Sequence, residues 1–323
     1  MANRRIFLAT ALLGTWKPSL VAAQPTGKVF RIGLLGNSPL DTPESVATWD
    51  AFRAELQKRG WSEGRNLAYV HRFAAGVAER HAQHARELID ANVDVIVTTT
   101  GSAAAAARRA TSTIPIVFAS VPDPVEQGLV ASLPHPGGNL TGLTTLGLEL
   151  SGKRLELLHE AFPAATRIAF LAAKLPERDR SVDETARRLG VQLLPARVTR
   201  AEDLAAAMRL LSQADAWFVG EEIIYFANRR TIIDFVHEQR KPAMYPSTFF
   251  VDAGGLMSYS VAQQAQYRRL AMLVDRILRG AKPGDLPVEQ PAQFELAINV
   301  KTANTLGLVI PSSVLVRADR LVQ

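Results

Sequence analysis

Residues 94–146 read DVIVTTTGSAAAAARRATSTIPIVFASVPDPVEQGLVASLPHPGGNLTGLTTL, and this stretch decides the fold. Two short apolar runs within it, 94–98 and 114–119, are rich in β-branched residues and have the length of buried strands. Each run leads through small polar residues into a predicted helix start, the first at Ser102 and the second at Asp123. Strands that alternate with helices predict a doubly wound parallel sheet with helices on both faces, an α/β fold.

Polar side chains gather where these strands end. Ligands of parallel sheets bind beyond the carboxyl ends of the strands, where helix amino termini direct free N–H groups outward. Thr100, Ser102 and Ser120 fall at this edge, and Ser38 follows an earlier predicted strand at 29–36. We expect Ser102 and nearby backbone N–H groups to bind a ligand carboxylate, each charge-assisted bond contributing about 1.5–3 kcal/mol.

Asp123 has two interpretations. Pro124 follows it and Glu126 stands three residues later, which is the pattern of a helix cap, a proline in the first turn and a capping-box acid. Asp123 also lies at the predicted ligand edge. The sequence leaves both roles open, a helix cap or a contact to the ligand.

The first 23 residues differ from the rest of the chain. Arg4 and Arg5 precede an apolar run that is too short to span a bilayer of about 30 Å, and small residues end the segment at Ala23. This pattern predicts a cleaved secretory signal. The paired arginines fit the twin-arginine route and general secretion equally well, and we leave both open.

The composition excludes several kinds of site and several classes of protein. The chain has no cysteine, which excludes disulfides, thiolate metal sites and a cysteine-linked lipid anchor. Removing the predicted signal leaves 34 basic against 31 acidic residues, a net charge of +3, and the arginine pairs are dispersed. We therefore expect a periplasmic protein that is not embedded in a membrane and does not bind nucleic acid.

The strand–helix alternation starts again after the first five units. Four further runs are predicted strands, at 167–172, 191–196, 214–220 and 242–246. This predicts a second lobe of the same architecture. Two elements follow it, a strand with a long helix at 256–280 and a last strand near 294–300.

Each of these extra elements needs a sheet to join. We assign 28–146 plus 256–280 to the first lobe, and 147–255 plus 281–323 to the second. Three chain crossings would then join the lobes and permit hinge closure over a cleft.

Signatures of enzymes are missing. No HExxH, GxSxG, phosphate loop or GxGxxG occurs, and no nucleophile stands at a recognisable spacing from a histidine. His81 and His84 lie three apart on a predicted helix, but their polar neighbours favour an exposed face over a metal site. We expect neither a catalytic residue nor a metal or other cofactor.

The second lobe offers its own candidates at the corresponding edge. Glu221 and Glu222 follow a predicted strand, where acids serve either in a binding site or as helix amino-terminal charges. Tyr225, Tyr245 and Tyr259 lie near strand ends and are candidates to stack on a flat ligand.

Four long strings, TSTIPIVFASVPDPVEQGLVASLPHPGGNLTGLTT, SGKRLELLHEAFP, AGGLMSYS and ILRGAKPGDLPVEQPAQFELAINVKTANTLG, resemble the substrate-binding proteins of ABC transporters, in the tryptophan/tyrosine-binding-like family. The resemblance covers essentially the whole chain after the signal. It implies a type I periplasmic-binding-protein fold, no enzymatic activity, and a membrane permease with its ATPase as partner. It implies the ligand more weakly, because the segments AAKLPERDRS and GEEIIYFANRR depart from the family's pattern at the second lobe's cleft edge.

The expected mechanism is closure of two lobes on one small ligand by a monomer. Ligand contacts made only in the closed form shift the population toward it. Glu221 would pair with a ligand ammonium opposite a carboxylate held at Ser102, which would select amino acids. An aromatic or other amino acid, another small carboxylate and a nucleoside-like compound remain open as ligands. A sensory module that feeds a receptor, or an exported α/β hydrolase, is the alternative function.

Overall fold

The computed structural model describes residues 27–37, 43–75, 77, 79–145, 147–172 and 180–323. The predicted signal at 1–23 and the candidate Ser38 lie outside these ranges. No helix within them has both the length and the apolar character that a membrane crossing requires.

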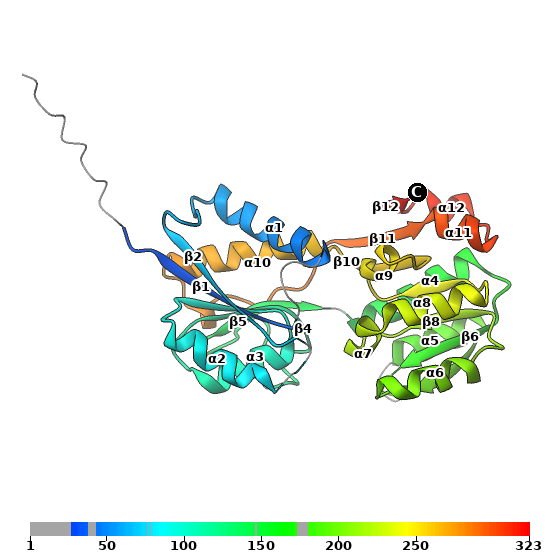
Figure 1. Ribbon diagram of the computed structural model, residues 1–323, viewed down its shortest axis with the longest axis horizontal. Helices are drawn as coiled ribbons and strands as arrows, with labels where there is room; N and C mark the ends of the chain where they lie inside the picture. Colours follow the sequence, from blue (N-terminus) through cyan, green and yellow to red (C-terminus); the bar gives the residue numbers. More distant parts are fainter. Residues whose placement is uncertain (1–26, 38–42, 76, 78, 146, 173–179) are drawn as a thin grey trace, which may run out of the picture.

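The first lobe is built on a five-stranded parallel sheet of order β2-β1-β3-β4-β5 (Figure 1). Its elements are β1 (Phe30–Gly36), α1 (Pro43–Lys58), β2 (Leu67–Phe73), α2 (Arg80–Asp90), β3 (Val95–Thr98), α3 (Gly101–Ala110), β4 (Ile116–Pro122) and β5 (Leu140–Thr145). The quoted stretch therefore forms three neighbouring strands, as the alternation predicts.

One predicted helix of this lobe is missing. Asp123 has a φ of 44°, in the left-handed region, whereas a helix cap is extended. The chain then makes one turn, in which the N–H of Leu129 donates to the carbonyl of Pro124 over 2.8 Å, and passes irregularly to β5. The prediction of a helix after Asp123 was wrong because the turn ends at Gly128, whose φ of 65° lies in the left-handed region and does not continue a helix.

The second lobe contains a seven-stranded sheet of order β12-β11-β10-β9-β8-β6-β7. Its first elements are α4 (Gly147–Ala161), β6 (Arg167–Ala172), α5 (Arg180–Leu189), β7 (Gln192–Arg197), α6 (Ala201–Leu210), β8 (Ala216–Val219), α7 (Ile223–Ala227), α8 (Arg229–Glu238), β9 (Ala243–Tyr245), α9 (Thr248–Asp252) and β10 (Met257–Val261). After α10 (Gln263–Leu278) and a short 3-10 turn, Pro283–Asp285, come β11 (Phe294–Asn299), α11 (Val300–Leu306), α12 (Ser312–Leu315) and β12 (Arg320–Val322).

Residues 256–280, assigned above to the first lobe as one piece, are divided between the lobes. Strand β10 pairs in parallel with β9 and antiparallel with β11, so it belongs to the second sheet. Helix α10 packs on α1 in the first lobe, through an apolar face that includes Leu270 and Val274. The boundary at 280/281 also moves, because Leu286 and Val288 pack in the first lobe's core before the chain reaches β11.

The carboxyl edges of the two sheets face each other. The chain leaves the first lobe after the carboxyl end of β5, returns after the carboxyl end of β10, and crosses again before the antiparallel β11. Figure 1 shows the lobes side by side, with these three crossings between them and α7 on the side of the second lobe nearest the first. The expected three-crossing hinge is therefore present.

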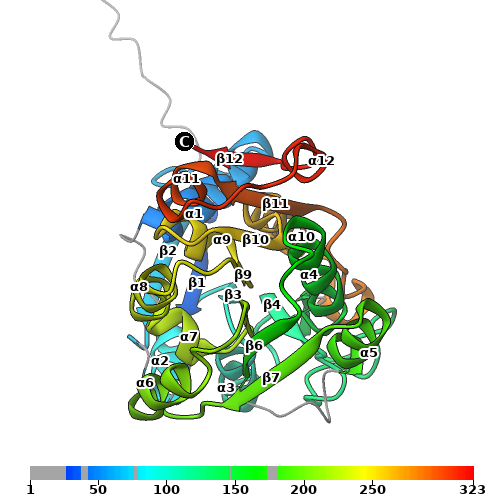
Figure 2. The same ribbon diagram turned by 90° about the vertical axis from the view of Figure 1, so that its right-hand side faces the viewer.

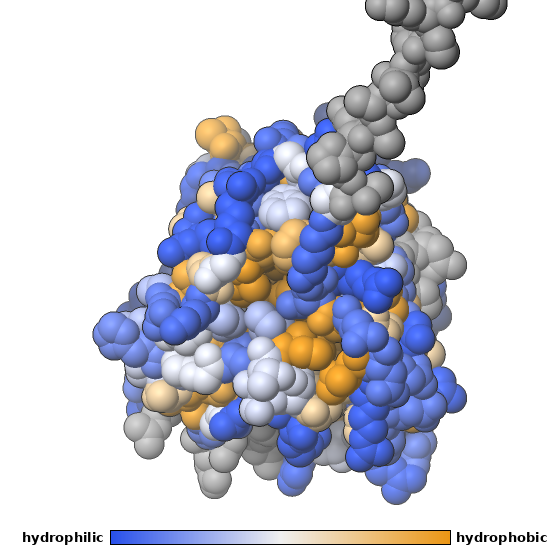
Figure 3. Space-filling view, turned by 90° about the vertical axis from the view of Figure 1, so that its left-hand side faces the viewer, coloured by the Kyte–Doolittle hydropathy of each residue, from blue (hydrophilic) through white to orange (hydrophobic). Residues whose placement is uncertain are grey.

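Helices cover both faces of each sheet. Four buried apolar clusters lie between them: α1 and α10 cover one face of the first sheet, and α2 and α3 the other. In the second lobe α4, α5, α11 and α12 cover one face, and α6 to α9 the other (Figure 2). Figure 3 shows apolar side chains gathered among charged ones on the end of the first lobe that points away from the second. The polar strand ends lie at the opposite end, toward the hinge.

Candidate functional site

The amino terminus of α3 supplies the first half of the candidate site. Thr100 caps this helix with an extended backbone, and its Oγ1 accepts the N–H of Ala103 at 3.2 Å. The same oxygen lies 3.2 Å from Oγ of the exposed Ser102. Gly101 between them is tightly approached, since a Cβ there would lie 2.5 Å from Oε1 of Gln127. The arrangement leaves the Ser102 hydroxyl at the open end of a ten-residue helix.

Ser120 and Asp123 lie on the neighbouring strand end. Ser120 is half-buried in β4, and Asp123 is exposed just beyond it. Oδ1 of Asp123 accepts the N–H of Glu126 at 2.9 Å, so the carboxylate stabilises the turn. The predicted helix cap is therefore wrong: Asp123 stabilises a turn, and no helix follows it. The buried Gln266 at the start of α10 donates from Nε2 to the carbonyl of Ala119 at 2.7 Å and supports the same strand end from behind.

Glu221 marks the second half of the site and has a partner that the sequence analysis missed. Its Oε2 lies 3.2 Å from Nη1 of Arg154, whose side chain is only 2% exposed, whereas that of Glu221 is 37% exposed. Arg154 also donates from Nε to the carbonyl of Tyr259 at 2.7 Å and from Nη2 to that of Pro246 at 3.0 Å. One guanidinium thus connects the segments that follow β8 and β9 with the middle of β10. Glu222 occupies the amino-cap position of α7.

The three candidate tyrosines differ in accessibility. Tyr225 and Tyr245 are fully buried, and the Tyr245 ring stacks on Phe250 at 5.1 Å between centroids. Burial raises the pKa of both phenols, and neither hydroxyl finds a hydrogen-bond partner among the described residues. Tyr259 is only partly buried and stacks on Phe294 at 5.9 Å. In this conformation Tyr225 and Tyr245 pack in the core behind the site and present no face to a ligand.

Arg154 could have been found from the sequence. It lies on the buried stripe of α4 with Leu150, Leu158 and Ala161, at positions i, i+4, i+8 and i+11. A charged residue in an apolar stripe of helical period is rarely left without a specific partner. The missing information was the identity of that partner, because Glu221 is 67 residues away along the chain.

His81 also differs from expectation. It is 1% exposed and lies on the inner stripe of α2 with Ala85 and Leu88, so the predicted exposed face was wrong for this residue. Burial lowers the pKa of His81 and favours the neutral imidazole. Within the described ranges no three His, Cys, Asp or Glu side chains gather in a way that would hold a metal ion.

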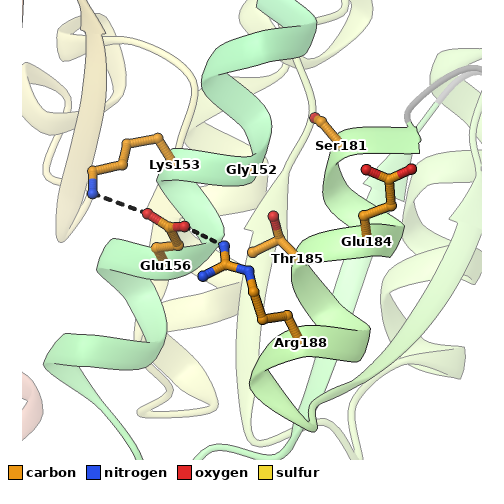
Figure 4. Close-up of a pocket in the computed structure, with 7 residues that line it drawn as sticks. All are labelled: Gly152, Lys153, Glu156, Ser181, Glu184, Thr185 and Arg188. Carbon is orange, nitrogen blue, oxygen red and sulfur yellow. Dashed lines mark hydrogen bonds and ion pairs between the residues drawn. The ribbon is translucent and has the colours of Figure 1, made fainter.

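A separate hollow of about 520 Å³ opens between α4 and α5 (Figure 4). Glu156 lies between Lys153 and Arg188, 2.9 Å from Nζ of Lys153 and hydrogen-bonded to Arg188. Hydrogen bonds from Arg188 and Lys153 hold the pKa of Glu156 below its usual value. None of the candidate site residues lines this hollow, and Lys153, Glu156 and Arg188 within it already pair with each other.

Comparisons with known proteins agree with this architecture. The family model for ABC transporter substrate binding proteins matches residues 37–322. A tyrosine-binding protein of Clostridioides difficile is 24% identical over 80% of this chain and 75% of its own length. A conserved domain protein from Vibrio cholerae is 28% identical with a TM-score of 0.81, over 91% of this chain and 100% of that one.

The crystal structure of an ABC domain with L-Trp from Streptococcus pneumoniae is 23% identical with a TM-score of 0.82, over the same shares of the two chains, and shares the fold. The expected two-lobed α/β architecture, of the type I periplasmic-binding-protein kind, is thus confirmed. The family is one of substrate-binding proteins. The chain belongs to the ABC transporter substrate-binding protein family and is the solute-binding component of such a transporter.

Proposed function

We propose that this protein binds an amino acid, of aromatic type, between its lobes and delivers it to a permease–ATPase complex. The observation that carries the proposal is the pairing of two opposed polar edges. A helix amino terminus with the Thr100 and Ser102 hydroxyls suits a carboxylate, and the part-exposed Glu221 suits an ammonium group. A free amino acid carries both groups.

The ligand site of this proposal comprises Ser38, Thr100, Ser102, Ser120 and Asp123 from the first lobe, with Glu221 and Tyr259 from the second. Tyr225 and Tyr245 support it from the core. The names of the similar proteins, one tyrosine-binding and one crystallised with L-Trp, support an aromatic side chain on the ligand. Micromolar affinity, about −8 kcal/mol, needs a few charge-assisted bonds and one buried aromatic face.

Thermal unfolding of the purified protein with L-tyrosine, L-tryptophan and the other amino acids tests the proposal, because a ligand of the native state raises the unfolding temperature. L-tyrosine or L-tryptophan should raise it most. Glu221→Gln should weaken binding by roughly 10-fold or more, as one charge-assisted bond implies. Glu202→Gln is the matched control, since Glu202 pairs with Arg200 on an exposed part of α6. A protein that no amino acid stabilises would refute the ligand class.

The proposal includes export to the periplasm with cleavage near Ala23, and action as a monomer. Fractionation of cells that express the full chain, with the mass of the mature protein, measures both the compartment and the cleavage site. The double variant Arg4→Lys, Arg5→Lys should stop export if the twin-arginine route is used, and leave it unchanged if general secretion is used. Full-length protein in the cytoplasmic fraction alone would refute export.

A further inference from the structure

Arg154 is a deeply buried cation with an unusual set of acceptors. Its three hydrogen bonds go to Glu221 and to the carbonyls of Pro246 and Tyr259, at 2.7 to 3.2 Å. Glu221 and Pro246 follow β8 and β9, and Tyr259 lies within β10, so the acceptors belong to three neighbouring strands of the second sheet. The guanidinium therefore connects these three strands near the edge that faces the first lobe.

The ion pair occupies one carboxylate oxygen of Glu221 and leaves the other available to a ligand. Arg154 takes Oε2, and Oε1 accepts no hydrogen bond from the described residues. A carboxylate held at one oxygen by a buried guanidinium has few side-chain conformations left, so a ligand that binds the other oxygen loses less conformational entropy. The planar fork of an arginine donates in several directions at once, which a lysine ammonium does not reproduce.

Arg154 also connects these strands with the hinge region. It lies on α4, which is the first element of the second lobe after the crossing from β5. Its position on the buried stripe of α4 means that the packed helix, rather than solvent, determines where the guanidinium lies.

We propose that Arg154 is a positioning residue that presents Glu221 to the ligand's ammonium group and so sets the preference for ligands with an α-amine. This inference rests on the proposed function and deepens it. Arg154 itself does not touch the ligand; it acts through Glu221.

The test compares L-tryptophan with indole-3-propionate, which lacks only the amine, by titration calorimetry on the mature protein. The quantity of interest is the ratio of the two affinities, because a merely structural role would weaken both ligands equally. In Arg154→Lys, which keeps the buried charge, this ratio should fall at least about fivefold, and in Glu221→Gln by roughly tenfold. Adding Arg154→Lys to Glu221→Gln should change the ratio no further, since the two act as one unit.

Arg188→Lys is the matched control, because Arg188 pairs with Glu156 on an exposed part of α5 and should leave the ratio unchanged. Circular dichroism verifies that each variant folds. If the parent binds neither L-tryptophan nor L-tyrosine, the proposed ligand class fails and this inference with it. If the parent prefers L-tryptophan and Arg154→Lys or Arg154→Gln keeps the same ratio, this inference alone is overturned.

Discussion

The substitution Asp275→Asn tests the packing of α10 on the first lobe. Asp275 is 6% exposed, and its Oδ1 accepts the indole N–H of Trp61 at 2.8 Å and the Nε–H of Arg279 at 2.7 Å. Its Oδ2 lies 3.4 Å from Nη1 of Arg59. One carboxylate thus joins the end of α1, the loop after it and the last turns of α10.

The expected loss follows from these three contacts. An asparagine keeps one acceptor for Trp61 but loses the charge and turns an N–H₂ group toward an arginine. Hydrogen bonds to charged groups contribute about 1.5–3 kcal/mol each when buried, but Arg279 is 57% exposed, so its share is small. We expect the free energy of unfolding to fall by about 2 kcal/mol, which lowers the unfolding temperature by roughly 4–8 °C.

The dependence on pH provides a sharper criterion. Burial disfavours the charged carboxylate, but the hydrogen bonds from Trp61 and Arg279 and the charges of Arg279 and Arg59 outweigh this and hold the pKa of Asp275 below its usual value. A lowered folded-state pKa means that the stabilisation is complete above the unfolded pKa of about 3.9 and is lost as the pH falls through the folded value. The difference in the free energy of unfolding between parent and variant should therefore be present at pH 7 and smaller at pH 3.

Urea unfolding at both pH values, followed by circular dichroism, measures this difference. Asp50→Asn is the control, since Asp50 pairs with Arg53 at the surface and is 62% exposed. It should change the unfolding free energy by less than about 0.5 kcal/mol. An Asp275→Asn variant as stable as the parent at pH 7, or one equally destabilised at pH 3, would refute the reasoning.

Three further substitutions probe two tightly packed glycines and one buried hydroxyl. Gly142→Ala should destabilise the first lobe by about 3 kcal/mol or more in urea unfolding, because its Cβ would lie 2.2 Å from a backbone oxygen of β4. Gly152→Ala should cost about 1–2 kcal/mol, since its Cβ would lie 2.9 Å from Oγ1 of Thr185 on α5; Gly27→Ala, with open space around it, is the control for both and should be neutral. Tyr245→Phe should keep or raise the unfolding temperature and leave ligand affinity unchanged, because it removes a buried hydroxyl without a partner among the described residues. A fall of more than about 1 kcal/mol in the free energy of unfolding is typical of a broken hydrogen bond, and would contradict the absence of a hydrogen-bond partner for the Tyr245 hydroxyl among the described residues.

The predicted site residues were placed with unequal success. Runs such as 94–98 and 114–119 identified strand ends correctly, so Thr100, Ser102, Ser120 and Glu221 all lie at the two facing edges. The aromatic candidates were less well placed, because distance to a strand end does not reveal which face of the sheet a side chain takes. Tyr245 and Tyr225 point into the core formed with α8 and α9.

The sequence by itself determined the alternation of strands and helices, the two lobes and the polar character of their facing edges. These features depend on the spacing of apolar residues and on turn residues, both of which act within a short stretch of chain. Only the tertiary structure decided that β10 joins the second sheet while α10 covers the first, since a strand joins whichever sheet edge is open to it. It also decided that Arg154 points inward to Glu221. A buried charge is stable only beside its partner, and partners distant in sequence meet only once the chain has folded.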